Sequence, residues 1–187
     1  MLILASKSPR RQELIKKIYT GDLKIYPANI NERAVKADSP FDLPYNIARE
    51  KGLYVSKLFP HDYVLSCDTL VFIDNQILTK PKDDQDAIRM LKLLNEKTHV
   101  VETSYFIIKD SKILSSKKIM TKLVLHNLTD KIIEAYLKTG SPFDKAGAYG
   151  IQDNNYINST IISGTYYNVM GLPIEEIKKD FEKLNIK

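Results

Sequence analysis

Apolar and polar residues follow one another in a pattern that predicts a mixed α/β fold. An apolar run at residues 2–4 predicts a short buried strand. Residues 12–18 behind it predict a helix, with Pro9 suited to the first helical position and Ser8 to the N-cap. The segment 22–28 predicts a second short strand that ends at a proline.

The rest of the chain alternates in the same way between periods typical of helices and of strands. The predicted elements are a polar loop at 28–44, a helix at 43–58, strands within 63–78 joined by a turn at 74–75, a helix at 83–94, long strands at 99–109 and 113–125 joined at 110–111, a helix at 129–139 ended by Gly140, a strand around 156–163 and a helix after Pro173. The long hairpin argues against a purely parallel doubly wound sheet. We expect one domain over residues 1–187.

Lys51 interrupts the apolar stripe of the helix predicted at 43–58. Ile47, Ala48 and Val55 lie three or four positions away, on the same helical face. A lysine there either extends its ammonium to the solvent edge, which is the commoner outcome, or meets an anion in a partly closed site. The pattern leaves both interpretations open.

Asp68 stands inside an otherwise apolar β segment, VLSCDTLVF. Strand interiors disfavour aspartate, and a buried carboxylate must be paired, hydrogen-bonded or bound to a metal. Asp68 is therefore the best single candidate for a general base or a magnesium ligand, unless it only closes a turn. The neighbouring Cys67 is interpreted as a small buried residue.

Three further positions carry charge at places that chemistry could use. Arg10 and Arg11 fall in the first turn of the first predicted helix, where the helix dipole disfavours cations. Either the turn serves a strongly anionic ligand or both arginines are solvated. Lys80 follows a short strand, and Glu32 in a polar loop resembles an ordinary solvated acid.

The segment FDKAGAYGIQD is rich in small residues. Gly147 and Gly150 let the backbone approach a ligand, and Asp144, Lys145 and Gln152 supply polar groups around it. The spacing is not that of a phosphate-binding Walker loop. The Gly-x-Ser-x-Gly elbow of serine hydrolases is also missing from the sequence.

Composition narrows the choice of partners. The 187 residues include 28 Lys and Arg against 23 Asp and Glu, and 43% of them are hydrophobic. The basic residues form no dense block and tryptophan is absent, so a nucleic-acid partner is disfavoured. No apolar run reaches the ~18 residues of a membrane span, so we expect no membrane partner and a cytoplasmic location. One cysteine and three dispersed histidines leave carboxylates as the ligands for any metal.

Taken together, these motifs resemble those of the Maf family of nucleotide pyrophosphatases, also called septum formation inhibitor Maf-like proteins. The resemblance runs from about residue 2 to residue 184 and rests on these motifs in order: Ser6-Lys7-Ser8-Pro9-Arg10-Arg11, Asn31-Glu32, Lys51, Cys67-Asp68-Thr69, Lys80-Pro81, HVVET at 99–103, DKAGAYGIQ at 144–152 and GTYYNVMGLP at 164–173. It implies an elongated mixed sheet flanked by helices, with two lobes around a cleft, similar to inosine triphosphate pyrophosphatases. It also implies a homodimer.

The resemblance further implies hydrolysis of a nucleoside triphosphate to a monophosphate and pyrophosphate, with Mg²⁺ or Mn²⁺. Asp68 would accept the proton of the attacking water, and Glu32 with Asp68 would hold the metal. Substrate binding would fall to these residues: Ser6, Ser8, Arg10, Arg11, Lys51, Thr69, Lys80, Asp144, Lys145 and Gln152.

Arg10, Thr69 and Gln152 match the branch of the family that resembles dTTP and UTP pyrophosphatases. The amide of Gln152 can donate and accept, as the edge of uracil or thymine requires. The chain departs from the family pattern at Asn31, Gly52, Thr79 and Asp153, where aspartate, alanine, glycine and glycine are usual. The alternative function is a nucleotide-binding regulator of cell division without turnover, but the presence of both Asp68 and Glu32 favours an enzyme.

Overall fold

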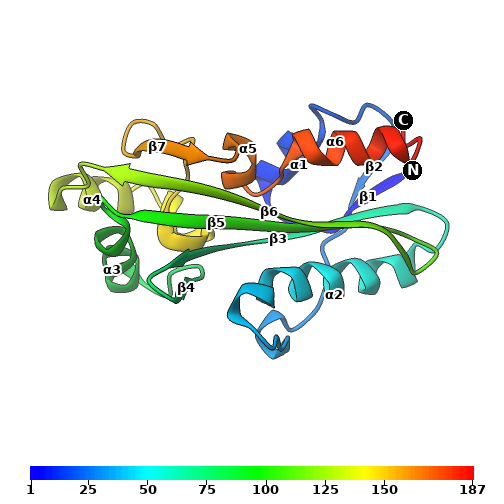
Figure 1. The fold of residues 1–187 in the computed structure, drawn as a ribbon, viewed down its shortest axis with the longest axis horizontal. Coiled ribbons are helices and arrows are strands. Elements are labelled where there is room, and N and C mark those ends of the chain that lie inside the picture. The colour runs from blue at the N-terminus through cyan, green and yellow to red at the C-terminus, as the bar shows by residue number, and fades with distance from the viewer. The chain divides into compact units, whose positions relative to one another are not determined.

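The structure is a computed structural model that describes residues 1–187 and confirms a mixed α/β fold (Figure 1). Its strands are β1 (Leu2–Leu4), β2 (Leu23–Ile25), β3 (Tyr63–Ile73), β4 (Gln76–Leu78), β5 (Thr98–Lys109), β6 (Lys112–His126) and β7 (Asn158–Ser163). Its α-helices are α1 (Pro9–Ile15), α2 (Leu43–Leu58), α3 (Asp84–Leu94), α4 (Asp130–Leu137), α5 (Tyr166–Val169) and α6 (Ile174–Lys183). Short 3₁₀ helices lie at Glu32–Ala34, Pro40–Asp42, Ser141–Asp144 and Ala146–Ala148.

The strands form one seven-stranded sheet in the order β2-β1-β3-β5-β6-β7, with β4 paired to β3. β1 is parallel to both β2 and β3, whereas β4 is antiparallel to β3 and β7 is antiparallel to β6. The sheet is therefore mixed, as the long predicted hairpin required, and helices flank it. No helix combines the length and the hydrophobicity that crossing a bilayer demands.

The chain divides into two compact units, which are described separately. Unit 1 comprises Met1–Asp68, Thr103–Ile119 and Gly171–Lys187. Unit 2 comprises Thr69–Glu102 and Met120–Met170. The single domain over 1–187 and the cleft between two lobes stay predictions.

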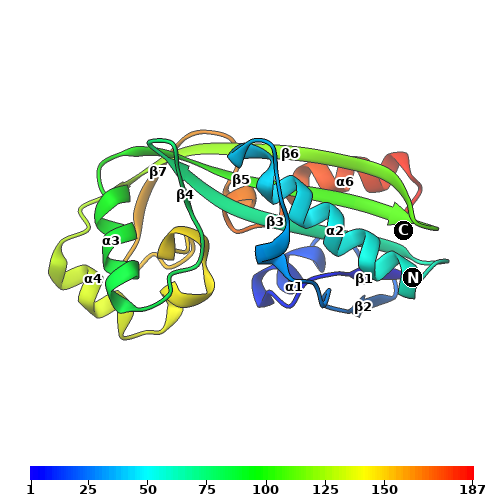
Figure 2. The same cartoon turned by 90° about the horizontal axis from the view of Figure 1, so that it is seen from below.

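In unit 1, helices cover both faces of the strands (Figures 1 and 2). Successive side chains of β5 point to opposite faces, so Phe106 packs under α2 while Tyr105 reaches Asp180 of α6 with a 2.6 Å hydrogen bond. The core beneath α2 consists of Ile3, Ala5, Ala48, Val55, Val64, Phe106 and Ile108. This packing fixes α2 against the strand that carries Asp68.

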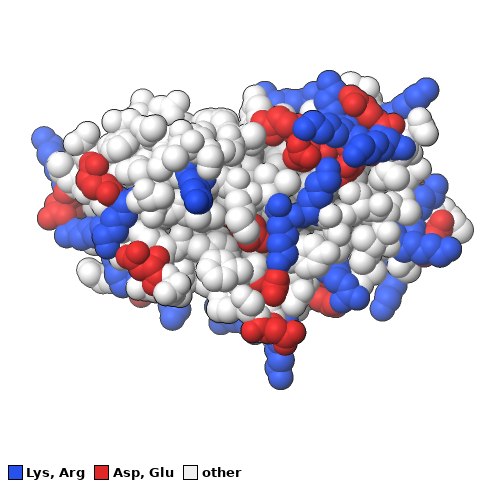
Figure 3. Space-filling view, viewed as in Figure 1, with Lys and Arg blue, Asp and Glu red and all other residues white.

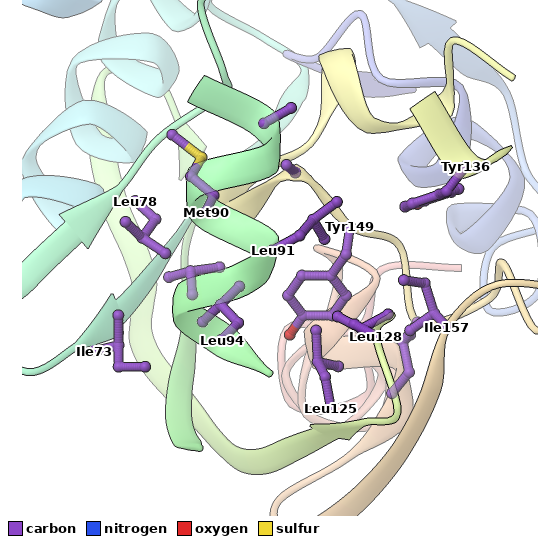
Figure 4. Packing of buried hydrophobic residues seen from close by; sticks show 14 of the residues in the cluster. Ile73, Leu78, Met90, Leu91, Leu94, Leu125, Leu128, Tyr136, Tyr149 and Ile157 are labelled. Atoms are coloured by element: carbon purple, nitrogen blue, oxygen red, sulfur yellow. The ribbon is translucent and has the colours of Figure 1, made fainter. Parts of the chain in front are cut away.

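In unit 2, α3 and α4 bury their apolar faces in a second core. Figure 4 shows the Tyr149 ring among leucines of α3 and of the segment 125–128. Asp83 and Thr129 cap the two helices, because their side chains accept hydrogen bonds from the amides of Asp86 and Ile132. Tyr149 belongs to the glycine-rich segment, so this core also anchors that segment.

Most predicted boundaries agree with the structure, and α2 has the predicted ends. The first helix differs, since it spans Pro9–Ile15 and the residues after it form tighter i→i−3 turns. Ser8 occupies the predicted N-cap position, but its side chain makes no capping hydrogen bond. Its backbone N–H instead donates to Ser6 Oγ at 3.2 Å.

Candidate active site

Asp68 lies in the middle of β3 and is 8% exposed, so it does not close a turn. Burial raises the pKa of its carboxyl group, and the charges of Lys51 and Arg11 partly oppose that rise. A carboxyl group whose pKa is raised toward neutrality suits proton transfer. The strongest sequence candidate is thus buried, and its role as a general base stays a prediction.

Lys51 does not extend to solvent. It is 7% exposed, and its Nζ donates to Asp68 Oδ1 at 2.8 Å. The same ammonium lies 3.0 Å from Glu32 Oε1. The anions that Lys51 meets in this structure are therefore two carboxylates, one buried and one exposed. Lys51 and Asp68 stand out in the sequence for separate reasons, Glu32 resembles an ordinary solvated acid there, and the fold brings the three together.

These two carboxylates fit a hard divalent cation. Glu32 Oε1 and Asp68 Oδ1 both contact Lys51 Nζ, so the distance between the two oxygens is at most the sum of the two contact distances. Mg²⁺ is typically held by one or two carboxylates together with water and substrate phosphates. No cluster of three or more potential His, Cys, Asp or Glu ligands is present, and the role of Glu32 and Asp68 as metal ligands stays a prediction.

Arg11 folds onto unit 1, so it is not an ordinary solvated arginine. Its Nε donates to Gly171 O at 2.8 Å, and its Nη1 donates to Cys67 O at 3.1 Å and to Ser6 Oγ at 3.4 Å. These contacts bring the start of α1 next to the residue before Asp68. Arg10 is half-buried in the same turn. Cys67 is fully buried, and burial raises the pKa of its thiol, in agreement with an inert residue.

On the face in Figure 3, Lys and Arg side chains are interspersed with Asp and Glu. That view contains no broad surface of a single sign, so net charge alone does not mark a binding surface there. The charges that bear on chemistry are instead those that the fold buries, such as Lys51 and Asp68.

In unit 2, the glycine-rich segment lies beside the residues that follow β4. The Gly147 N–H donates to Thr79 O at 3.1 Å. Glycine suits position 147 because its φ of +71° lies in the left-handed region, which residues with a side chain rarely adopt. Lys80 is exposed next to this contact, and Thr69 is half-buried in β3. This backbone hydrogen bond places the segment that contains Lys80 beside the segment that contains Lys145.

Lys145 is 8% exposed and is held almost entirely by its own loop. Its Nζ donates to Ser141 O at 2.6 Å, to Ser141 Oγ at 2.9 Å and to the exposed Asp144 at 2.7 Å. Ser141 was not among the sequence candidates, because a single serine in a loop carries no signal of this role.

Gln152 and Asp153 follow at the end of the same segment. Gln152 Nε2 donates to Asp153 Oδ1 at 3.3 Å. A Cβ at position 150 would overlap Gln152 Nε2 and would lie 2.7 Å from Lys145 Cε, so a larger residue there would displace the ends of these two side chains. Tyr136 also joins this cluster through Asp153 and was missed, because its place in an amphipathic helix suggests only a core residue.

Comparison with known proteins identifies the family of the chain. A family model described as Maf-like protein matches residues 1–184. The chain belongs to the Maf family. Its curated relatives in the family include a dTTP/UTP pyrophosphatase from Pyrococcus abyssi, 44% identical over 177 residues that cover 95% of this chain and 92% of that protein. A dTTP/UTP pyrophosphatase from Latilactobacillus sakei is 37% identical over 96% of this chain and 98% of that protein.

Among solved structures, this Maf chain is similar to one described as the structure of a HAM1 protein from Coxiella burnetii. The TM-score is 0.54 at 11% sequence identity, and the match covers 97% of this chain and 98% of that one. At this level of identity the likeness concerns the fold alone, and it agrees with a mixed sheet flanked by helices.

Proposed function

We propose that this protein is a nucleoside triphosphate pyrophosphatase that hydrolyses dTTP and UTP to the monophosphate and pyrophosphate. Relatives that carry the name dTTP/UTP pyrophosphatase match nearly the whole chain at 37% to 44% identity. The observation that carries the proposal is the buried carboxylate of Asp68 held by the ammonium of Lys51, with Glu32 on the same nitrogen.

Hydrolysis between the α- and β-phosphates requires an activated water and neutralisation of the developing negative charge. Asp68 is proposed as the proton acceptor, which its raised pKa and its buried position favour. A divalent cation, Mg²⁺ or Mn²⁺, would be held by Glu32 and Asp68. When bound, it would neutralise phosphate charge as a Lewis acid.

The basic residues are proposed to bind the triphosphate. In unit 1 these are Arg10 and Arg11, together with Ser8 and with Ser6, whose hydroxyl accepts from Arg11. Lys51 would exchange a carboxylate for a phosphate oxygen, which an ammonium can do because its donors rotate freely. Charge-assisted contacts of this kind are about twice as strong as neutral ones.

The remaining substrate contacts are proposed for residues of unit 2, and Arg10 of unit 1 is proposed to contribute to base preference as well. Lys80 would add a phosphate contact, and Asp144 and Lys145 would shape the loop around the ligand. Base preference is assigned to Arg10, Thr69 and Gln152. The homodimer and the cytoplasmic location implied by the family resemblance stay predictions.

The test is a panel of nucleoside triphosphates with Mg²⁺ or Mn²⁺, in which monophosphate, pyrophosphate and phosphate are each quantified. We expect equal amounts of monophosphate and pyrophosphate, formed fastest from dTTP or UTP, and none without the metal. Release of single phosphates would contradict the cleavage site. Tight nucleotide binding without any turnover would contradict the enzyme and favour the regulator.

A further inference from the structure

Asp153, which lies at the end of the glycine-rich segment, is fixed by several hydrogen bonds. Its Oδ2 accepts from the Tyr136 hydroxyl and, at 2.7 Å, from Ser141 Oγ. Burial and the bond to Asp153 raise the pKa of Tyr136, so this hydroxyl stays a donor. Lys145 Nζ lies 3.9 Å from the same oxygen. The carboxylate therefore has one oxygen fully engaged and the other, Oδ1, left for Gln152.

This arrangement determines which way the Gln152 amide faces. An ionised carboxylate only accepts hydrogen bonds, so the amide must turn its NH₂ group toward Asp153 Oδ1. Its carbonyl oxygen, Oε1, then points away from Asp153. That oxygen is buried and has no hydrogen-bond partner. An unsatisfied buried acceptor costs about 1–3 kcal/mol, so a donor that reaches it gains that amount.

We propose that Asp153 is a positioning residue for base selection, which holds Gln152 Oε1 as a fixed acceptor for the imide N–H of thymine or uracil. The inference rests on the proposed function, because it assigns the base contact within that nucleotide site. Uracil and thymine carry a hydrogen at N3, whereas N3 of cytosine is an acceptor and would face Oε1 with repulsion. The Gln152 side chain as a whole is partly exposed, and the proposal requires the groups over Oε1 to move aside when the base binds.

Asp153→Asn is the sharpest test because it keeps the shape of the side chain. The Tyr136 and Ser141 hydroxyls both donate to position 153, so the new amide turns its oxygen to them and its NH₂ to Gln152. Gln152 must then reverse, with Oε1 toward residue 153 and NH₂ toward the base. Thymine loses its acceptor, and cytosine gains a donor for N3.

We expect the dTTP-to-dCTP ratio of kcat/KM to fall by at least about tenfold, the value of one hydrogen bond, with dCTP improving in absolute terms. Structural damage would weaken both substrates, so improvement with dCTP separates reorientation from misfolding. Asp153→Gly, which leaves Gln152 free to turn either way, should give an intermediate ratio. Asp130→Asn removes an exposed carboxylate of α4 and should leave the ratio unchanged. An unchanged ratio in both Asp153 variants would overturn the inference.

Affinities for dTTP and dCTP are also measured in the Asp68→Asn background, where turnover is not needed. A shift in binding preference there, together with a wild-type protein that hydrolyses neither nucleotide, would support base selection and refute the pyrophosphatase. Normal hydrolysis of dTTP, with no effect of the Asp153 variants on the dTTP-to-dCTP ratio of kcat/KM or of affinity, would support the pyrophosphatase and refute base selection by Asp153. Equal wild-type affinity for dTTP and dCTP, or no binding of either, would overturn the role of Asp153 directly.

Discussion

Lys51 and Lys145 are both buried lysines, at 7% and 8% exposure, but different parts of the chain neutralise them. Lys51 in unit 1 meets Asp68, 17 residues away, and Glu32 from a separate loop. Lys145 in unit 2 donates hydrogen bonds to Ser141 and Asp144, at most four residues away, and lies 3.9 Å from Asp153 of the same glycine-rich segment. The first cluster can form only when α2, β3 and the loop are assembled, whereas the second is a property of one loop.

The two clusters also differ in charge. The Lys51 cluster contains one ammonium and two carboxylates, so it carries surplus negative charge that a divalent cation can compensate. Lys145 is hydrogen-bonded to one carboxylate and two neutral oxygen acceptors, and its second carboxylate, Asp153, lies at 3.9 Å and is also held by the hydroxyls of Tyr136 and Ser141. Buried groups of the first kind suit chemistry, and groups of the second kind suit the positioning of a loop. Each of the following changes tests this contrast.

Asp68→Asn should have the largest effect. The amide keeps the size of the side chain but cannot accept a proton, so we expect kcat to fall by about 10³-fold, within the range of general-base catalysis. Nucleotide affinity should change little. Turnover is measured by pyrophosphate release and affinity by calorimetry.

The matched control is Asp180→Asn, which alters another buried carboxylate of unit 1. Asp180 accepts from Tyr105, Ser115 and Lys117 and takes no part in the candidate site. This variant should lose stability but keep kcat per folded molecule. Wild-type turnover in Asp68→Asn would refute the general-base role.

Lys51→Met should have the largest effect on stability. It leaves Asp68 buried without its main partner, which costs about 3–5 kcal/mol of unfolding free energy near pH 7. Asp68 already has a raised pKa in the folded chain, and loss of Lys51 raises it further. The folded variant then binds a proton more readily than the unfolded one, so the loss should shrink as pH falls.

Urea unfolding of Lys51→Met at pH 7 and pH 5 measures this difference. The double variant Lys51→Met, Asp68→Asn should regain much of the loss, because it removes the uncompensated charge. A loss that is equal at both pH values and is not regained in the double variant would show that Lys51 acts through packing alone.

Lys145→Met should cost less, about 1–2 kcal/mol, and its cost should be the same at pH 5 and pH 7. The hydrogen-bond partners that it leaves, Ser141 and Asp144, are half-buried and exposed, so water can replace the ammonium, and Asp153 keeps the hydroxyls that donate to it. The same urea experiment gives the value. A loss as large and as dependent on pH as that of Lys51→Met would erase the contrast between the two clusters.

Sequence patterns predicted local features of both units well. The ends of α2, the turns at 74–75 and 110–111 and the aspartate inside a buried strand follow from hydrophobic period and turn chemistry. Such features depend on neighbours within a few residues. For the same reason the apolar residues on either side of Asp68 are enough to mark it as the chief candidate.

The partner of Lys51 could not be derived in the same way. Helical period places Lys51 in an apolar stripe, but only the pairing of β1 with β3 and the packing of α2 bring Asp68 to it. Tyr136 and Ser141 were missed because an amphipathic helix and a loop serine have many ordinary uses. Their role depends on Asp153, which closes the cluster from a third segment.

Gly52 explains how α2 comes close enough for Lys51 to reach Asp68, and its change to alanine should have the smallest effect. A Cβ at position 52 would overlap Ser66 Oγ and lie 2.7 Å from Ile108 Cδ1. Ser66 cannot turn away freely, because its hydroxyl donates to Ala48 O at 2.7 Å. Overpacking costs about 1–3 kcal/mol, and the better helix propensity of alanine returns about 1 kcal/mol.

We therefore expect Gly52→Ala to lower the unfolding free energy by about 1 kcal/mol and to displace α2 slightly from β3. Because Lys51 precedes Gly52, the 2.8 Å contact with Asp68 should lengthen and nucleotide turnover should fall with it. Adding Ser66→Ala removes the overlapping hydroxyl, so the pair should be more stable than the sum of the two single changes. If the two losses simply add, α2 is not held at its distance by this contact, and the reach of Lys51 depends on the remaining core.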